Sequence, residues 1–147
     1  MKKMILASAV LLALTACSST DSDSDYSCTV SRNDKTVSMT MRYRDYGESR
    51  TAILGVNEKG SYYVTYIRGE TYPNADFAKD ECEDEQGYDF EYERLVNCYG
   101  NTVEITTYDY EDYDLDEYEY SYKKRCANYD KAARDGDLEK KYIKAFE

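Results

Sequence analysis

Carboxylates, thiols and tyrosine hydroxyls are the side chains with which this chain could do chemistry. It has 30 acidic and 19 basic residues, 18 tyrosines and 5 cysteines, and it contains no histidine. The lack of histidine excludes a Ser-His-Asp or Cys-His catalytic set, a histidine-ligated zinc and an imidazole base that titrates near neutral pH. The net charge of −11 argues against nucleic-acid binding, which needs clustered lysine and arginine.

The densest group of carboxylates lies between Asp109 and Glu119, where seven of eleven residues are acidic. Cation binding is one interpretation, but Glu117 and Lys123 stand where a calcium loop needs a glycine and a bidentate glutamate. Recognition of a basic partner is a second interpretation. We expect a third, a solvated segment that caps a helix, since carboxylates stabilise the first turn of a helix. No two carboxylates are singled out for glycoside hydrolysis, so we predict no catalytic, metal-binding or cofactor-binding residue.

The fifth cysteine, Cys17, belongs to a distinctive N-terminal segment. A basic start is followed by an apolar run from Met4 to Leu14, which is typical of a secretory signal peptide and shorter than the roughly 20 residues of a membrane-spanning helix. The sequence Leu14-Thr15-Ala16-Cys17 resembles the lipobox of bacterial lipoproteins. This resemblance implies cleavage before Cys17 and a lipid on its thiol. Ser18, in place of an aspartate, implies the outer membrane in a cell that has two. An ordinary secreted protein is the alternative.

We therefore expect three parts: a signal peptide over residues 1–16, a lipidated cysteine with a flexible tether over residues 17–25, and one folded domain over residues 26–147. The tether has no apolar residue between Ser18 and Asp25, which is typical of a solvated linker. From Lys123 onward there are eight basic and five acidic residues, against nine basic and 25 acidic ones in residues 17–122. We expect this basic segment to lie against an acidic face of its own domain, with a phosphate-binding patch as the alternative.

The folded domain is poor in aliphatic residues. After residue 17 it contains sixteen Val, Ile, Leu and Met residues and three phenylalanines. Several tyrosines must therefore be buried, each with a hydroxyl that needs a partner. Sugar stacking on Tyr62, Tyr63 and Tyr66 is conceivable, but we expect these tyrosines to fill the strand positions that tyrosine favours.

Period-two alternation of apolar and polar residues predicts the strands. A meander of four strands is expected over Tyr26 to Val30, Val37 to Tyr43, Thr51 to Val56 and Ser61 to Ile67. A hairpin around Gly100-Asn101 is expected to join two more strands, Arg94 to Cys98 and Thr102 to Thr107.

Capping residues and helical spacing predict the helices. Asn74 is expected to cap a first helix that carries Cys82 and ends at Gly87. Asp114 with Glu117 fits a capping box, and it opens a helix of about twenty residues with an apolar face spaced for helical periodicity. That face consists of Leu115, Tyr118, Tyr122, Cys126, Tyr129 and Ala133. Gly136 ends this helix, and Asp137 caps a last short one with Leu138, Tyr142 and Phe146. The order ββββαββαα predicts an α+β fold with helices packed on one face of the sheet.

The remaining four cysteines are predicted to form two disulfides. An even set outside the cytoplasm favours disulfides, and the spacings of 54, 16 and 28 residues contain no CxxC knuckle of the kind found in a four-thiolate zinc site, the competing interpretation. A short return through residues 87–93 brings Cys82 over the strand that ends with Cys98. Cys28 faces inward on the first strand, and Cys126 lies at the middle of the apolar face of the long helix. We predict the pairs Cys82–Cys98 and Cys28–Cys126.

With the segment Val96-Asn97-Cys98-Tyr99-Gly100-Asn101-Thr102-Val103, this arrangement resembles a group of small four-cysteine bacterial lipoproteins over residues 26–128. The resemblance supports the fold and implies no activity. We expect a lipid-anchored, non-enzymatic structural or interaction module of the cell envelope, held to the membrane through Cys17. The alternatives are an acidic binding protein or inhibitor for a basic envelope partner, such as a cell-wall hydrolase, and a carboxylate-based glycan hydrolase.

Overall fold

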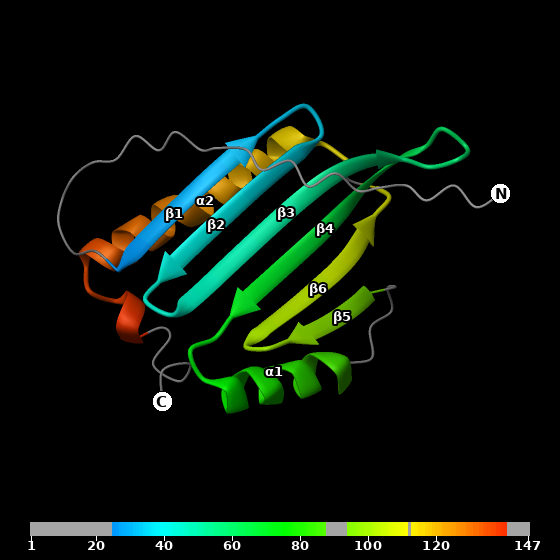
Figure 1. The fold of residues 1–147 in the computed structure, drawn as a ribbon. Coiled ribbons are helices and arrows are strands. Elements are labelled where there is room, and N and C mark those ends of the chain that lie inside the picture. Colours follow the sequence, from blue (N-terminus) through cyan, green and yellow to red (C-terminus); the bar gives the residue numbers. More distant parts are fainter. Residues whose placement is uncertain (1–24, 88–93, 112, 141–147) are drawn as a thin grey trace.

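A computed structural model describes residues 25–87, 94–111 and 113–140 of the chain. Its strands are β1 (Tyr26–Arg32), β2 (Thr36–Tyr43), β3 (Tyr46–Val56), β4 (Tyr62–Thr71), β5 (Arg94–Tyr99) and β6 (Thr102–Asp109), and its long helices are α1 (Ala75–Gly87) and α2 (Leu115–Arg134). The strands form one antiparallel sheet in the order β1-β2-β3-β4-β6-β5 (Figure 1). The predicted α+β fold and its element order are thus confirmed through α2.

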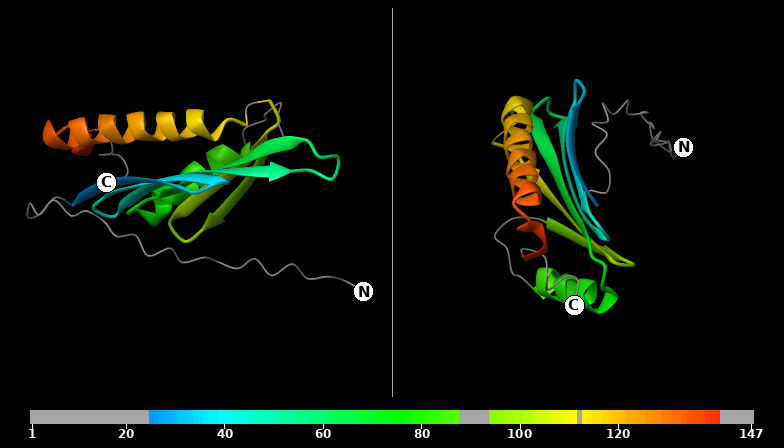
Figure 2. Two further views of the ribbon diagram at one scale, coloured as in Figure 1. Left: turned by 90° about the horizontal axis from the view of Figure 1, so that it is seen from above. Right: turned by 90° about the vertical axis from the view of Figure 1, so that its left-hand side faces the viewer.

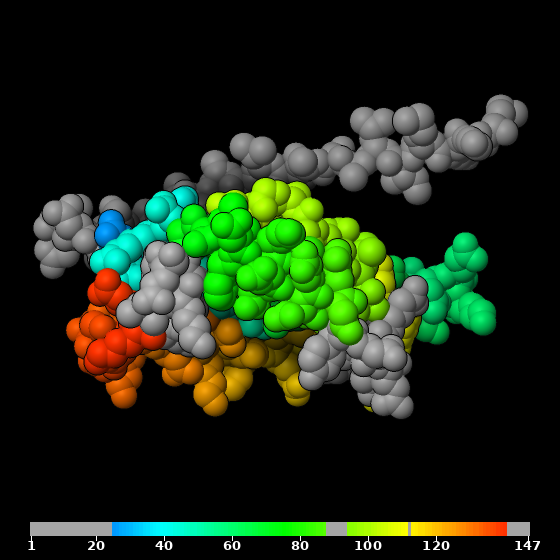
Figure 3. Space-filling view, turned by 90° about the horizontal axis from the view of Figure 1, so that it is seen from below, coloured from blue at the N-terminus to red at the C-terminus, as the bar shows by residue number. Residues whose placement is uncertain are grey.

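Both helices pack against the same face of the sheet. The directly paired residues Cys28, Met41, Glu48, Glu70, Val103 and Cys98 form a single row across all six strands. Directly opposed residues in neighbouring strands project to the same side, so Cys28 and Cys98 lie on a common face. Helix α2 packs over β1, β2 and β3, and α1 packs over β5 and β6 (Figure 2). In the view of Figure 3, α1 covers its end of the sheet and α2 runs along the adjoining side.

Two disulfides attach the helices to this face, as predicted. Cys28 of β1 is bonded to Cys126 of α2, with their Cα atoms 5.5 Å apart. Cys82 of α1 is bonded to Cys98 of β5, with a Cα separation of 6.2 Å. Because these bridges consume all four thiols, the alternative of a four-thiolate zinc site is wrong. The bridges link the two edge strands of the sheet to the two helices that cover it.

The core between the two helices and the sheet mixes a few aliphatic residues with buried tyrosines. The sheet contributes residues that include Val37, Met39, Met41, Ala52, Val64, Val103 and Ile105. Tyr46, Tyr72, Tyr122 and Tyr129 are also buried, which confirms that tyrosines replace aliphatic residues in this core. The hydroxyls of Tyr72 and Tyr129 donate to Glu70 and Glu48 respectively.

The largest departures from the predicted strand bounds are in β3 and β4. β3 begins at Tyr46 rather than Thr51, and β4 continues beyond Ile67 to Thr71. Apart from Tyr46, the added residues are polar, charged or glycine, so they lack the apolar alternation on which the prediction rested. They remain extended because they pair in register with each other, from Gly47 opposite Thr71 to Arg50 opposite Arg68.

The predicted helix boundaries are confirmed within the described residues. The Asp114 side chain accepts a hydrogen bond from the backbone N–H of Asp116 at 2.8 Å, as a helix N-cap does. Gly136 has a φ of 71° just beyond α2, a conformation that glycine adopts at helix ends. Residues 138–140 are helical. Tyr142 and Phe146 of the expected last helix lie outside the described residues, as do the signal peptide, Cys17 and the tether up to residue 24.

Candidate functional site

The acidic segment from Asp109 to Glu119 serves largely as a helix start. Asp114 caps α2, and Asp116 and Glu119 both contact Arg32 of β1, at 2.5 and 2.7 Å. Glu119 also forms an ion pair with Lys123 one turn along the helix. In residues 25–87, 94–111 and 113–140, no three carboxylates or thiols are grouped so that they could hold a metal ion. The capping interpretation thus holds for Asp114, and the carboxylates of Asp116 and Glu119 serve to attach the start of α2 to β1.

A different group of charges, which the sequence patterns did not reveal, lies across the two central strands. Glu48 of β3 is directly opposite Glu70 of β4, and Arg50 is directly opposite Arg68. Like charges placed opposite each other repel, so each needs a partner from elsewhere. Arg68 forms an ion pair with Glu85 of α1 at 2.7 Å, and Glu48 receives its partners from α2. The central strands thus present charges to both helices.

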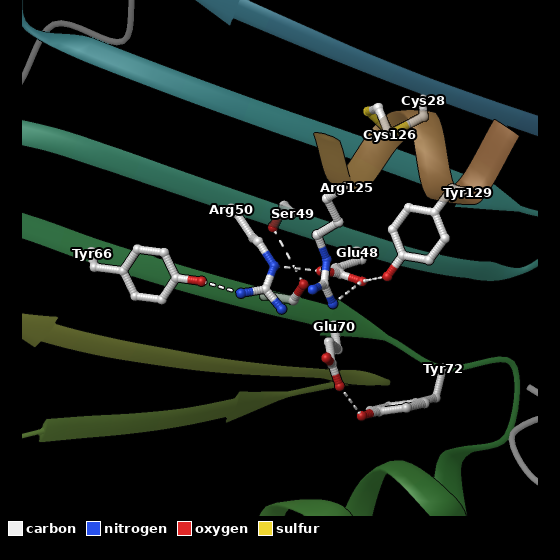
Figure 4. Close-up of polar contacts among 11 residues, drawn as sticks. Cys28, Glu48, Ser49, Arg50, Tyr66, Glu70, Tyr72, Arg125, Cys126 and Tyr129 are labelled. Atoms are coloured by element: carbon white, nitrogen blue, oxygen red, sulfur yellow. Dashed lines mark hydrogen bonds and ion pairs between the residues drawn. A yellow bond between two sulfur atoms is a disulfide. The ribbon is translucent and has the colours of Figure 1, made fainter. Parts of the chain in front are cut away.

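Glu48 is the most deeply buried charge in the described residues, with 2% of its surface exposed. Its carboxylate accepts hydrogen bonds from Arg50 on its own strand, from Arg125 Nε at 2.8 Å and from the Tyr129 hydroxyl (Figure 4). Burial alone would raise the pKa of Glu48, but the hydrogen bonds from Tyr129, Arg50 and Arg125, together with the charge of Arg50, outweigh burial and hold that pKa below its usual value. Arg125 belongs to the basic C-terminal segment, so at this position that segment meets an acidic residue of its own domain.

Arg50 belongs to this network and also lines a cavity of about 510 Å³ between α2 and the sheet. Its Nε donates to Glu48 and its Nη1 donates to the Tyr66 hydroxyl, so the guanidinium is held at two points (Figure 4). Arg125 and Lys124 of α2 also line the cavity, and Asp109 at the end of β6 contributes a carboxylate. In a chain whose net charge is −11, a cavity with three basic side chains and one acidic one is a local reversal of sign.

Three tyrosines complete the cavity wall. Tyr66 of β4 stacks on Tyr118 of α2, with ring centroids 6.3 Å apart, and Tyr118 meets the edge of Tyr122 at the same distance. Tyr122 is 3% exposed, and its hydroxyl has no hydrogen-bond partner among the residues that the structure describes. Burial raises the pKa of Tyr122, so this hydroxyl stays protonated and can donate. A buried donor without an acceptor is uncommon in folded proteins.

This arrangement offers hydrogen-bond donors and aromatic surface to a ligand. Glu48 is ionised and surrounded by donors, which makes it a poor proton donor. A glycosidase needs two carboxylates about 5–9.5 Å apart across its cleft, whereas Asp109 is the acidic side chain among the described residues of this cavity wall. Basic, aromatic, hydroxyl and amide groups that converge on one concave site are typical of a ligand pocket.

Sequence reasoning singled out Tyr66, Tyr118 and Tyr122 but missed Arg50, Glu48 and their contacts. The signal was present: the alternation of Ala52 and Leu54 continues backward in phase through Arg50, Glu48 and Tyr46. Charged residues in the inward phase mark positions that need a buried partner.

The fold and cavity define a disulfide-linked α+β protein with a basic, tyrosine-lined cleft. Comparison with protein-family models, with curated proteins and with solved structures finds no match. Neither α1 nor α2, the long helices of the described part, combines the length and apolar character needed to cross a membrane.

Proposed function

We propose that this chain is a lipid-anchored, non-enzymatic binding protein of the cell envelope, which uses the cleft between α2 and the sheet. The cleft is the observation that carries the proposal, because it gathers basic and aromatic groups around a cavity of about 510 Å³. Cavities of roughly 300–1,000 Å³ are typical of small-ligand sites. The absence of histidine from the chain and the engaged state of Glu48 support binding over turnover.

The anchor rests on the N-terminal sequence. The lipobox-like Leu14-Thr15-Ala16-Cys17 supports lipidation of Cys17, and Ser18 favours the outer membrane where a cell has two. The two disulfides support the envelope, because disulfides persist in oxidising compartments and are rare in the cytosol. Two or three acyl chains anchor a protein stably without any other membrane contact.

Metabolic labelling with a fatty-acid probe tests the anchor. The wild-type protein should take up label and sediment with the outer membrane, whereas Cys17→Ser should stay unlabelled and accumulate as the precursor. Ser18→Ala is the matched control, since it changes the neighbouring residue and keeps the thiol. Equal labelling of wild type and Cys17→Ser would refute the lipid anchor.

A basic protein partner is the second candidate, and the charge distribution favours it. Residues 17–122 carry nine basic and 25 acidic side chains, and α1 exposes Asp76, Asp80, Glu83 and Asp84. Complementary charge accelerates encounter and weakens as salt rises. A pull-down from envelope extract should therefore retain a cationic protein at low salt and release it at high salt. Capture that does not depend on salt would contradict a charge-driven complex.

A further inference from the structure

We propose that the cleft between α2 and the sheet binds the carboxylate of an acidic sugar, with Arg50, Lys124, Arg125 and the Tyr122 hydroxyl as its anion-binding groups. This inference rests on the proposed binding function and specifies its ligand. The ligand class follows from the charge, the unpartnered donor and the aromatic surface of the same cavity.

The charge of the cleft favours an anion. Arg50, Lys124 and Arg125 line the cavity together with Asp109. Glu48 neutralises part of this charge, because Arg50 and Arg125 both donate hydrogen bonds to its carboxylate. The site remains positive by one charge when Glu48 and Asp109 are set against the three cations. Arg50 is also held in place by Tyr66, and a guanidinium fixed in this way is suited to recognise a carboxylate.

Tyr122 supplies an independent indication that a ligand oxygen belongs here. Tyr122 lines the cavity, and its hydroxyl is buried and has no partner among the described residues. A small movement of the Tyr122 ring toward the cavity would let a carboxylate bound to the nearby basic groups accept a hydrogen bond from this donor and satisfy it. Buried polar groups without partners are costly and are usually satisfied by protein, water or ligand.

The remaining wall favours a sugar over a bare anion. The stacked rings of Tyr66 and Tyr118 offer an aromatic surface of the kind on which the C–H face of a sugar packs. Thr107, Ser121 and Asn128 also line the cavity, and their hydroxyl and amide groups both donate and accept hydrogen bonds, as sugar hydroxyls require. The cavity of about 510 Å³ lies within the range of sites for small ligands.

The test is an NMR titration of the isotope-labelled mature lipoprotein in detergent micelles with D-glucuronate, D-glucose and inorganic phosphate. Glucuronate and glucose differ by one carboxylate, so glucuronate should bind about tenfold or more tightly, the effect of a charged hydrogen bond. Glucuronate should also bind more tightly than phosphate. Its shift changes should centre on residues of the cleft.

Matched variants separate the cleft from general effects of charge. Lys124→Gln and Tyr122→Phe should each weaken glucuronate binding by about threefold to tenfold. Lys123→Gln removes the same charge from the adjacent position on α2, and Tyr120→Phe removes a hydroxyl from a residue that is 70% exposed. Neither control should change the affinity. Folding of each variant is verified by the dispersion of its spectrum.

Each outcome bears on a stated claim. Equal binding of glucose and glucuronate would overturn the anionic ligand and leave the cleft as a sugar site. Phosphate that binds as tightly as glucuronate would overturn the sugar and leave an anion site. If none of the three probes shifts the cleft residues, both this inference and the binding function fail, whereas the lipid anchor is judged separately by labelling of Cys17.

Discussion

The Glu48 carboxylate accepts a hydrogen bond from Arg125 Nε at 2.8 Å, although 77 residues separate them along the chain. This contact joins the central strand β3 to the helix α2 beneath the sheet. The same carboxylate accepts from Arg50 and Tyr129, so one buried charge organises both the packing of α2 and the basic wall of the cleft. Stability and the proposed binding therefore depend on the same residue.

Replacing Glu48 by glutamine should destabilise the fold strongly. The substitution keeps the shape of the side chain and removes the negative charge that compensates Arg50, whose side chain is 17% exposed. Breaking a buried ion pair from one side costs about 3–5 kcal/mol, and we expect about 3 kcal/mol less free energy of unfolding in urea. Glu139→Gln, which removes an exposed partner of Arg44, is the control and should cost at most about 1 kcal/mol. Equal losses for the two variants would contradict a special role for Glu48.

The contribution of Glu48 should fade in acid. Its pKa is lowered in the folded state, so the folded protein holds the charged form more strongly than the unfolded chain does. The resulting stability is fully present above the unfolded glutamate pKa of about 4.3 and is lost as pH falls through the lower, folded value. The difference in unfolding free energy between wild type and Glu48→Gln should therefore shrink below about pH 4. A difference that stays constant from neutral to acid pH would refute the lowered pKa.

Alkaline pH should unfold the protein through its buried tyrosines. Burial raises the pKa values of Tyr46, Tyr72 and Tyr122 above the ordinary value. Their stabilising effect is complete below the unfolded tyrosine pKa of about 10 and is lost as pH rises above it. Part of the tyrosinate absorbance should therefore appear together with the loss of circular dichroism. Ionisation of all tyrosines with the dichroism intact would show that these hydroxyls reach solvent in the folded state.

The two disulfides should differ in their effect on stability. Cys28–Cys126 closes a loop with a sequence separation of 98, whereas Cys82–Cys98 spans 16. In the chain-entropy model the longer loop stabilises by about 4.7 kcal/mol and the shorter one by about 3 kcal/mol. The double variant Cys28→Ala/Cys126→Ala should therefore have the lower urea midpoint when compared with Cys82→Ala/Cys98→Ala. The reverse order would show that packing of the helices, rather than loop closure, dominates.

The acidic segment should behave as a helix cap. Asp114→Ala removes the side chain that accepts from the Asp116 N–H, and loss of an N-cap costs about 1 kcal/mol. Glu117→Gln changes a residue in the first turn of α2. It keeps the Asp114 cap and should cost only about a few tenths of a kcal/mol. Calcium should leave the melting temperature of the wild type unchanged. A rise with calcium that disappears in Asp114→Ala would favour the cation-binding interpretation.

Most of the fold follows from short-range patterns. Alternation placed the strands, capping residues placed α1 and α2, and the position of each cysteine within its element was enough to predict both disulfides. These features depend on neighbours a few residues apart, which is the range over which strand and helix periodicity act. The first residues of β3, Tyr46 to Arg50, were not predicted as part of the strand, because their inward positions include charged side chains.

The cleft depends on contacts that no local pattern encodes. Alternation places Glu48 in the inward phase of β3 but does not identify its partners, which are settled only because the pairing of β2, β3 and β4 sets it beneath α2. Tyr122 fits the apolar face of its helix, yet packing leaves its hydroxyl without a partner in the described residues. Segments far apart in the chain must come together before such charges and donors meet. Their burial then strengthens the electrostatic interactions between them. Local periodicity thus specified the helices, the strands and the disulfides that link them, whereas the packing of α2 on the sheet decided the site.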